Sequence, residues 1–361
     1  MKLLVSVLAL LGALTTDLSA QWQLALPGWK YAFPRDHEPH RDFKTEWWYF
    51  TGNVRAADGH RFGYQLTFFR QGVRLPDAPN VASRFVLNDF KFAHFAISDL
   101  NDARYHFQQK ISRGAFGEAG FGAEKLAWIE DWNLQLAADG TFQLSARDAD
   151  LSLSLMLNAE KPWAIHGENG VSQKAVGEGH ASHYYSGTRM KTSGLLAVRG
   201  REFAVTGESW FDHEWATNQL TSEQIGWNWF SLQLDDGTEL MLYQMRMRDG
   251  STDPASSGTF IARNGSTRHL HRDDYQLMPR EFCTSEETGG RYPIAWEIAV
   301  PALDLKLKVT TPLKNQELVL KPIAYWEGAI ELTGTRSGKS VRGHGYLELT
   351  GYAGALVGLS N

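Results

Sequence analysis

Alternating apolar and polar residues recur along this chain and predict β-strands rather than helices. Residues Leu151 to Leu157 place a leucine at every second position, as in a strand with one buried face. The aromatic run from Glu46 to Asn53 and the segment from Phe62 to Arg70 flank Asp58-Gly59, a typical hairpin turn. No segment combines a long helical period with capping residues. The pattern therefore predicts an all-β protein, built as a sandwich or a barrel.

The aromatic run that begins at Glu46 carries the first candidate for chemistry. Side chains of a strand alternate between its faces, so Glu46, Trp48 and Phe50 should share one face and Trp47 and Tyr49 the other. A carboxylate beside buried rings is costly unless it is paired or protonated. Glu46 is therefore either a proton-transfer group in an apolar site or a hydrogen-bonded residue at the mouth of the strand.

The densest polar cluster of the sequence runs from residue 210 to residue 215. Alternation predicts that one face of a strand carries Phe211, His213 and Trp215, and the other Trp210, Asp212 and Glu214. His213 is a candidate general acid or base, because imidazole titrates near neutral pH. Burial would raise the pKa of Asp212 or Glu214 and make either a proton donor. The alternative is that His213 is a core residue, hydrogen-bonded to a tyrosine or to the backbone.

The second half of the chain repeats features of the first half. Residues 227–231 (WNWFS) resemble residues 47–51 (WWYFT), and residues 343–348 resemble residues 207–212. After the Asp-Gly turn of each half, Tyr243 matches Tyr64. The repeat indicates an internal duplication. We expect an N-terminal domain over residues 21–218 and a C-terminal domain over residues 219–361, each opened by an aromatic hairpin.

Composition and charge narrow the classes of function. The chain has 361 residues, more than a single core usually holds. Aromatic residues make up 12 % and include 13 Trp, which favours large cores or a ring-lined cavity. The net charge of −5 disfavours nucleic acid as a partner. Cys283 is the only cysteine, so an intrachain disulfide is excluded, and a free surface thiol is expected there rather than a nucleophile.

The first twenty residues read as a targeting segment. Lys2 provides a positive start, residues 3–14 are apolar, and Ser19-Ala20 supplies the small residues of a cleavage site. The apolar part is too short for a convincing membrane span. We expect a signal peptide over residues 1–20, cleaved near Ala20, and an exported protein that is periplasmic or extracellular.

Motifs of several other enzyme classes are absent from the sequence. It contains no Gly-x-Ser-x-Gly elbow, phosphate loop or dinucleotide fingerprint. His269 and His271 could point two imidazoles the same way on a strand, but no third ligand is evident nearby, so a solvated loop is expected. His37 and His40 lie among prolines and are predicted to be loop residues. We predict neither a metal nor a cofactor.

Several motifs together resemble the AttH-like and carotenoid 1,2-hydratase (hydroxyneurosporene synthase) superfamily. They occupy residues 45–53, 62–70, 184–186, 210–215 and 226–230. The resemblance implies a pair of lipocalin-like β-barrels, in agreement with the repeat. Members of the superfamily include carotenoid hydratases, fungal hydratases and cyclases of terpenoid or polyketide-like compounds, and AttH-type proteins that accompany an ABC export system.

The resemblance also implies site residues. In the hydratase branch, the His and Trp of an Asp-His-x-Trp motif line the pocket, and these correspond to His213 and Trp215. That branch also uses a Tyr and a nearby Asp as acid. Tyr243 is in place here, but Gln244 and Met245 follow it and no Asp does. The acid of that branch is therefore not supplied at this position.

Three hypotheses follow from the residues and the resemblance together. The first is an enzyme, a hydro-lyase, isomerase or cyclase that acts on a bulky apolar substrate. The second is a non-catalytic lipophile carrier or an accessory component of an ABC exporter. The third is a hydrolase, for which neither a nucleophile nor a metal site is evident. The predicted catalytic residues are Glu46, Asp212, His213 and Tyr243, and the predicted substrate-binding residues are Trp48, Tyr185, Trp210, Trp215, Trp227 and Trp229.

Overall fold

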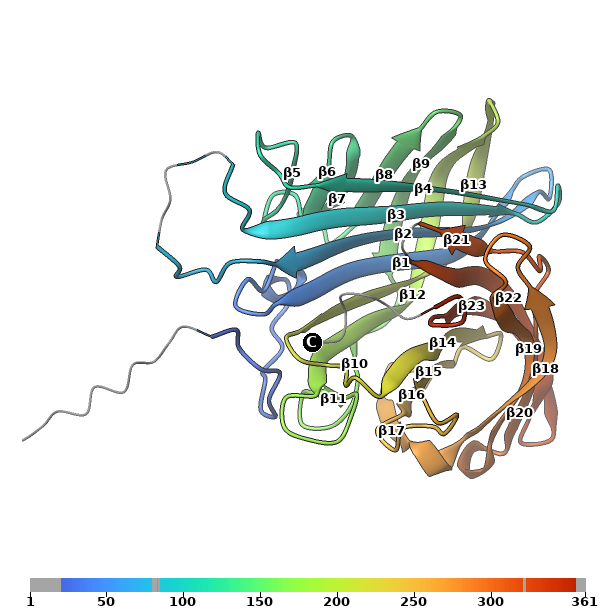
Figure 1. Cartoon of the computed structure of the whole chain (residues 1–361). Helices are drawn as coiled ribbons and strands as arrows, with labels where there is room; N and C mark the ends of the chain where they lie inside the picture. The colour runs from blue at the N-terminus through green and yellow to red at the C-terminus, as the bar shows by residue number, and fades with distance from the viewer. Residues whose placement is uncertain (1–20, 80–82, 84, 321–322, 355–361) are drawn as a thin grey trace, which may run out of the picture.

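Two antiparallel β-sheets make up the protein (Figure 1). The computed structural model describes residues 21–79, 83, 85–320 and 323–354. The first sheet contains β1 (Thr45–Ala56), β2 (Arg61–Gly72), β3 (Asp89–Asp99), β4 (Arg104–Ser112), β5 (Ala119–Phe121), β6 (Ala127–Ile129), β7 (Trp132–Leu136), β8 (Phe142–Asp148), β9 (Leu151–Ala159), β10 (Ala164–Ile165), β11 (Ser172–Gln173), β12 (Ala181–Val198) and β13 (Arg201–Ala216).

The second sheet follows the first in the chain. It contains β14 (Gln224–Leu234), β15 (Glu239–Met247), β16 (Ser257–Ile261), β17 (Thr267–His271), β18 (Gln276–Thr284), β19 (Arg291–Val300), β20 (Leu305–Thr310), β21 (Glu317–Val319), β22 (Ala324–Arg336) and β23 (Lys339–Leu349). Three short 3-10 helices complete the described elements: η1 (Arg35–His37), η2 (Arg272–Asp274) and η3 (Pro301–Leu303). The predicted domain boundary at residue 218 falls between the last strand of one sheet and the first strand of the other.

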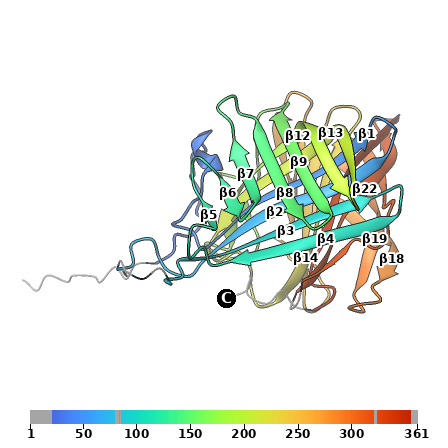
Figure 2. The same cartoon turned by 90° about the horizontal axis from the view of Figure 1, so that it is seen from above.

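The second sheet repeats the strand order of the first, which continues with β6 and β5 at one edge, and this agreement reflects the repeat in the sequence. The first runs β4-β3-β2-β1-β13-β12-β9-β8-β7-β6-β5, and the second runs β17-β16-β15-β14-β23-β22-β20-β19-β18. In each sheet, the first strand of that half of the chain pairs with its last strand, β1 with β13 and β14 with β23. One sheet is nearly closed into a barrel and the other is a half-barrel, and Figure 2 shows β6 to β9 crossing in front of β2 to β4. The predicted fold, two lipocalin-like barrels related by duplication, is confirmed.

Strand register corrects one detail of the predicted repeat. Thr67 lies opposite Tyr49 in the β1–β2 pair, and Tyr243 lies opposite Trp229 in the β14–β15 pair. With Tyr49 and Trp229 as equivalent residues, the counterpart of Tyr243 is Thr67 rather than Tyr64. The second hairpin is shorter than the first. Aligning the two sequences by residue identity beyond the turn therefore paired Tyr243 with the wrong residue of β2.

The apolar residues form cores inside each sheet and a further cluster between the sheets. The first sheet encloses Trp48, Phe50 and Trp132, and the second encloses Phe230 and Trp296. The cluster between the sheets joins residues of both halves, among them Tyr49, Tyr184, Trp210, Trp229, Tyr243 and Tyr346. A Cβ on Gly63 would lie 2.8 Å from Cβ of Ala329, so glycine permits the close approach of β2 to β22.

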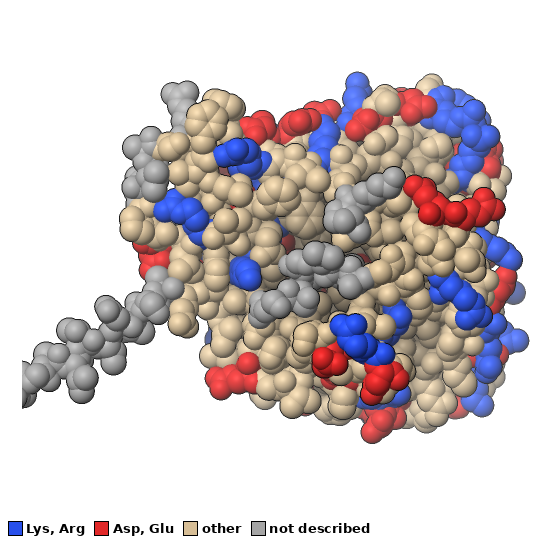
Figure 3. All heavy atoms as spheres, viewed as in Figure 1, with Lys and Arg blue, Asp and Glu red and all other residues tan. Residues whose placement is uncertain are grey.

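The surface of the described chain is mixed in charge. On the face shown in Figure 3, positive and negative side chains are interspersed. Cys283 is a free, partly exposed cysteine. Among the described residues there is no helix whose length and apolar character would allow it to cross a membrane. The predicted signal peptide, residues 1–20, lies outside the described residues.

Candidate functional site

A cavity of about 350 Å³ lies between the two sheets. Its walls come from the faces of β1 and β14 that point away from the barrel interiors. Aromatic side chains dominate these walls, with Trp47 and Tyr49 from β1, Phe69 from β2, and Trp227 and Trp229 from β14. Rings of this kind suit a bulky apolar ligand, and a few convergent polar groups would orient it. The polar side chains that line the cavity include Asp212, Glu348 and the ion pair of Lys174 with Glu214.

The duplication places two carboxyl groups at equivalent positions in the cavity. Asp212 of β13 lies opposite Tyr49 of β1, and Glu348 of β23 lies opposite Trp229 of β14. All four residues line the cavity. Each half of the protein therefore contributes one ring and one carboxyl group from corresponding strands, and the cavity has an acid on both walls.

Glu348 is partly buried and has few partners for a carboxyl group in an apolar cavity. The indole Nε1 of Trp227 donates a hydrogen bond to Oε2 of Glu348 at 2.9 Å, and this is its one donor among the described residues. Burial raises the pKa of Glu348 to about 7, although the Trp227 donor opposes the rise. A carboxyl group that titrates near neutral pH in an apolar cavity can donate a proton as an acid and accept one as a carboxylate.

A second buried acid, Glu327, stands beside Glu348. It is the cross-strand neighbour of Glu348 in the β22–β23 pair. Its Oε1 accepts a hydrogen bond from the Tyr49 hydroxyl at 2.6 Å, while its Oε2 is buried without a partner. Burial and the nearby Glu348 raise the pKa of Glu327 well above its usual value. The raised pKa favours the protonated form of Glu327.

Asp212 is held by more donors than Glu348. Its Oδ1 accepts hydrogen bonds from Ser186 and, at 2.6 Å, from the Trp210 indole, and its Oδ2 accepts one from the Tyr184 hydroxyl at 2.8 Å. Burial raises the pKa of Asp212 to about 7 against these donors. Trp229 Nε1 donates to the Tyr184 oxygen at 3.0 Å, so a chain of hydrogen bonds connects the second sheet to Asp212.

Lys174 is the buried cation of the cavity. Its Nζ lies 3.1 Å from Oε1 of Glu214 and also sits over the rings of Tyr184 and Tyr243, at 4.8 and 4.2 Å from their centroids. Burial alone would lower the pKa of Lys174, but Glu214 holds it above the usual value. The Tyr243 hydroxyl donates to the Gln173 carbonyl at 2.6 Å, so it is already engaged by the backbone.

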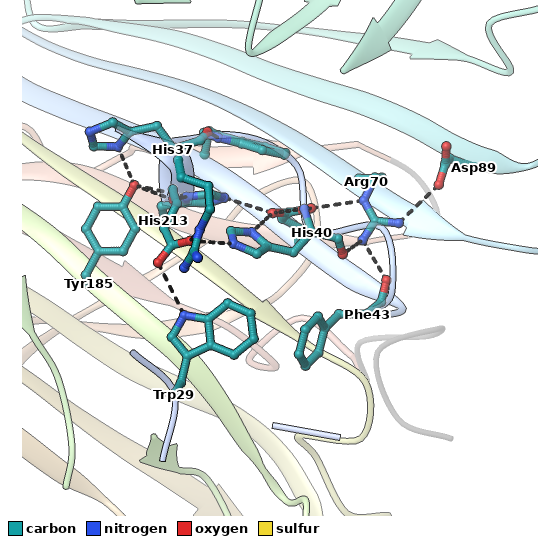
Figure 4. A network of polar contacts seen from close by, with 12 residues as sticks. Trp29, His37, His40, Phe43, Arg70, Asp89, Tyr185 and His213 are labelled. Atoms are coloured by element: carbon teal, nitrogen blue, oxygen red, sulfur yellow. Dashed lines mark hydrogen bonds and ion pairs between the residues drawn. The ribbon is translucent and has the colours of Figure 1, made fainter. Parts of the chain in front are cut away.

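A second polar network lies inside the first barrel, on the opposite face of β1 and β13 (Figure 4). Oε1 of Glu46 lies 2.8 Å from His40 Nδ1 and 3.0 Å from His213 Nε2, and its Oε2 accepts from Arg70 Nε at 3.0 Å. The side chains of Glu46, Arg70 and His213 are fully buried. Burial would raise the pKa of Glu46, but hydrogen bonds from His213 and His40 and the charge of Arg70 lower it well below its usual range. Glu46 is therefore a paired carboxylate.

Aromatic rings stack on two histidines of this network. The Trp215 ring stacks on His40 with centroids 3.7 Å apart, and the Trp48 ring stacks on His213 at 4.6 Å. The Tyr185 hydroxyl lies 3.0 Å from Nδ1 of His213. His40, Glu46 and His213 also have ligand atoms close enough for a metal ion. Arg70 already supplies the positive charge there, which disfavours a metal ion at this position.

The structure separates the predicted site residues into two places. Those that line the cavity are Asp212, Tyr243, Trp227 and Trp229, with Trp210 packed behind them as a donor to Asp212. Those in the network inside the first barrel are Glu46, His213, Trp48, Tyr185 and Trp215. The two groups occupy opposite faces of the same strands, as the alternation predicted.

Several residues of both places were not singled out from the sequence. In the cavity these are Glu348 and Lys174, and Glu327 lies opposite Glu348 in the β22–β23 pair. In the barrel network they are His40, which was predicted only to be a loop residue, and Arg70. Glu348 could have been found from the repeat. The alignment of residues 343–348 with residues 207–212 places Glu348 at the position of Asp212.

The raised pKa of Glu348 predicts how stability depends on pH. Carboxyl groups of unfolded chains titrate near pH 4, so between about pH 5 and pH 7 the folded protein holds a proton on Glu348 that the unfolded chain has lost. Stability contributed by this group therefore falls as pH rises across that window. Glu348→Gln should be more stable than wild type above pH 7, by roughly 1–3 kcal/mol, with a smaller difference at pH 5.

Urea unfolding at pH 5, 6, 7 and 8 would measure this difference. Glutamine keeps an acceptor for Trp227, so the comparison isolates the charge. Glu331→Gln is the control, because Glu331 is half-exposed and paired with Arg61 at the surface. Wild type and Glu348→Gln curves that stay parallel over the whole range would contradict a raised pKa at Glu348.

Comparison with known proteins places the chain among relatives of the same fold. A protein from Nitrosomonas europaea assigned to AttH has a solved structure that is 33 % identical, with a TM-score of 0.82 over 91 % of this chain and 99 % of that chain. Kievitone hydratase from Nectria haematococca is 14 % identical with a TM-score of 0.70, over 92 % of this chain and 99 % of that one, and shares the fold.

One curated relative is a dehydratase. Dehydratase asqC of Emericella nidulans is 23 % identical over 222 residues, which are 58 % of this chain and 61 % of that protein. The chain thus spans less than two thirds of the length of this relative. The AttH-like family model matches residues 24–352, nearly the whole described structure. The chain therefore belongs to the AttH-like family, whose relatives include a hydratase and a dehydratase.

Proposed function

We propose that this protein binds a bulky apolar compound between its two sheets and transfers a proton to or from it, in a hydration, dehydration or cyclisation. The observation that carries the proposal is Glu348, an acid with a pKa of about 7 in a cavity walled by rings. The hydratase and dehydratase among the relatives support this class of reaction. We also propose that the protein works after export, on the basis of the signal-like residues 1–20.

In a dehydration, the residues of the cavity take different roles. Protonated Glu348 donates its proton to a substrate hydroxyl, and the C–O bond breaks with its electron pair leaving on water. The faces of Tyr49 and Trp229 stabilise the positive charge that develops on carbon. Asp212, as carboxylate, removes a proton from the adjacent carbon, and the electrons of that C–H bond form the alkene. The reverse sequence adds water.

Native mass spectrometry of the protein purified from its natural host tests the binding part of this proposal. We expect a terpenoid, polyketide-like or lipid-like compound to co-purify, and to be lost from Leu220→Trp, in which a larger ring fills part of the cavity. Recovery of no apolar compound, together with no binding from a panel of hydrophobic ligands, would contradict the proposal. The same compound retained by Leu220→Trp would place the ligand elsewhere.

A non-catalytic carrier is the second candidate function. It is favoured by the largely apolar walls and by the hydroxyl of Tyr243, which the Gln173 carbonyl already engages. A carrier of this kind could deliver its ligand to an ABC exporter. The two candidates differ in one result: the enzyme converts the co-purified compound, whereas the carrier returns it unchanged.

A further inference from the structure

A cluster of metal-ligating side chains lies outside the cavity, where the two halves of the chain meet. His269 and His271 belong to the edge strand β17, and Glu168 lies in the turn between β10 and β11 of the first half. Their ligand atoms all lie within 4.8 Å of one another. The sequence offered only the two histidines, because the third group comes from a segment about a hundred residues earlier in the chain.

Strand geometry points both imidazoles of β17 the same way. Leu270, between them, is buried in the core of the second sheet, so the neighbouring side chains point out of the barrel. The two rings lie 4.7 Å apart between centroids. Nδ1 of His269 is buried and has no hydrogen-bond partner. A buried imidazole nitrogen without a partner is costly, and a ligand at this position would remove that cost.

The turn that carries Glu168 is attached to the same part of the second sheet. Nδ1 of His166 lies 2.9 Å from Oγ1 of Thr259, and Thr259 is the cross-strand neighbour of His269 in the β16–β17 pair. Glu168 and Val171 close the turn through two backbone hydrogen bonds. The carboxylate is therefore held beside the two imidazoles by ordered backbone rather than by a free loop.

Two imidazoles and one carboxylate form a donor set suited to a divalent transition metal. Zinc takes histidine nitrogen and carboxylate oxygen in tetrahedral sites, and water can complete the fourth position. The two histidines alone would leave the metal underligated, and Glu168 supplies both the third ligand and a negative charge.

We propose that Glu168, His269 and His271 bind one zinc-class divalent ion, which ties the β10–β11 turn of the first half to the edge strand β17 of the second. Such an ion would link the two halves beside the cavity and limit their movement relative to each other. This site is independent of the proposed reaction, since none of its residues lines the cavity.

Isothermal titration of the full chain with zinc, without a histidine affinity tag and after treatment with a chelator, tests this site. We expect one equivalent to bind and a higher melting temperature in its presence. His269→Gln and Glu168→Gln should each weaken binding at least roughly tenfold, given the losses known for disrupted metal sites. Cobalt should add absorption bands typical of tetrahedral coordination in wild type but not in His269→Gln.

One control variant separates this site from another histidine cluster. His60 lies 2.7 Å from Asp99 in a separate, partly buried cluster, and His60→Gln should leave zinc binding unchanged. All ligands of the proposed site are at least partly exposed, so their replacement should not unfold the protein. Zinc binding that persists in the double variant His269→Gln/His271→Gln, binding without a defined stoichiometry, or no binding by wild type would each overturn the proposal.

Discussion

Replacing Glu348 with glutamine should lower turnover of the co-purified compound by roughly 10²–10⁴-fold, the usual contribution of a general acid or base. Glutamine has nearly the same shape and can still accept from the Trp227 indole, but it has no proton to give. Ligand affinity should therefore change little, and the loss should lie in kcat rather than KM. Asp212→Asn is a less clean test, because an amide cannot accept all three hydrogen bonds that Asp212 receives.

The pH profile gives this prediction a second readout. If Glu348 acts as the acid, the wild-type rate should fall as pH rises through about 7, where its proton is lost. The rate of the Glu348→Gln variant should not show this decrease with rising pH. Glu331→Gln, half-exposed at the surface, is the control and should retain both rate and profile. Full turnover by Glu348→Gln would remove Glu348 from the chemistry and leave Asp212 as the remaining acid of the cavity.

The strand faces could be predicted from the sequence because alternation is a local property. Glu46 and Trp48 do share one face with each other, and Asp212 lies on the face opposite His213, as expected. Which face borders a ligand cavity is not local. Both faces of β1 carry rings, so the sequence offered no reason to prefer the side where the second sheet packs over the side enclosed by the first barrel.

The sequence also did not reveal which residues pair with a buried charge. Glu46 invited a catalytic role because a carboxylate among rings is expensive, yet His40 and Arg70 stabilise it as an ion. Arg70 is opposite Glu46 in the β1–β2 hairpin, so this pair could be read from the register once the turn was placed. His40 could not, because it lies in irregular chain whose course depends on the barrel that it covers.

The position of Lys174 shows the same limit in the cavity. It follows β11 in a Gly-rich segment without a periodic pattern, and nothing local distinguishes it from a surface lysine. Its Nζ meets Glu214 from a different strand, 3.1 Å away. A pairing of this kind becomes visible only when the complete sheet is assembled.

Replacing Arg70 with leucine should destabilise the protein by about 3–5 kcal/mol, the usual cost of removing one partner of a buried ion pair. Besides Glu46, the Arg70 guanidinium donates to Asp89 at 3.1 Å and to the carbonyl groups of His40 and Phe43, at 2.9 and 2.6 Å. Leucine would leave the Glu46 charge less compensated and both carbonyl groups without their donor. The midpoint of urea unfolding, with its slope, measures the loss.

Arg61 offers a matched comparison, because it makes one ion pair at the surface, 2.6 Å from Glu331. Arg61→Leu should cost no more than about 1 kcal/mol, as is usual for exposed pairs. The double variant Arg70→Leu/Glu46→Gln should recover part of the loss, since the uncompensated charge is then absent. An Arg70→Leu variant as stable as Arg61→Leu would mean that the barrel network does not hold the first sheet together. A catalytic role for Glu46 and His213 would then regain support.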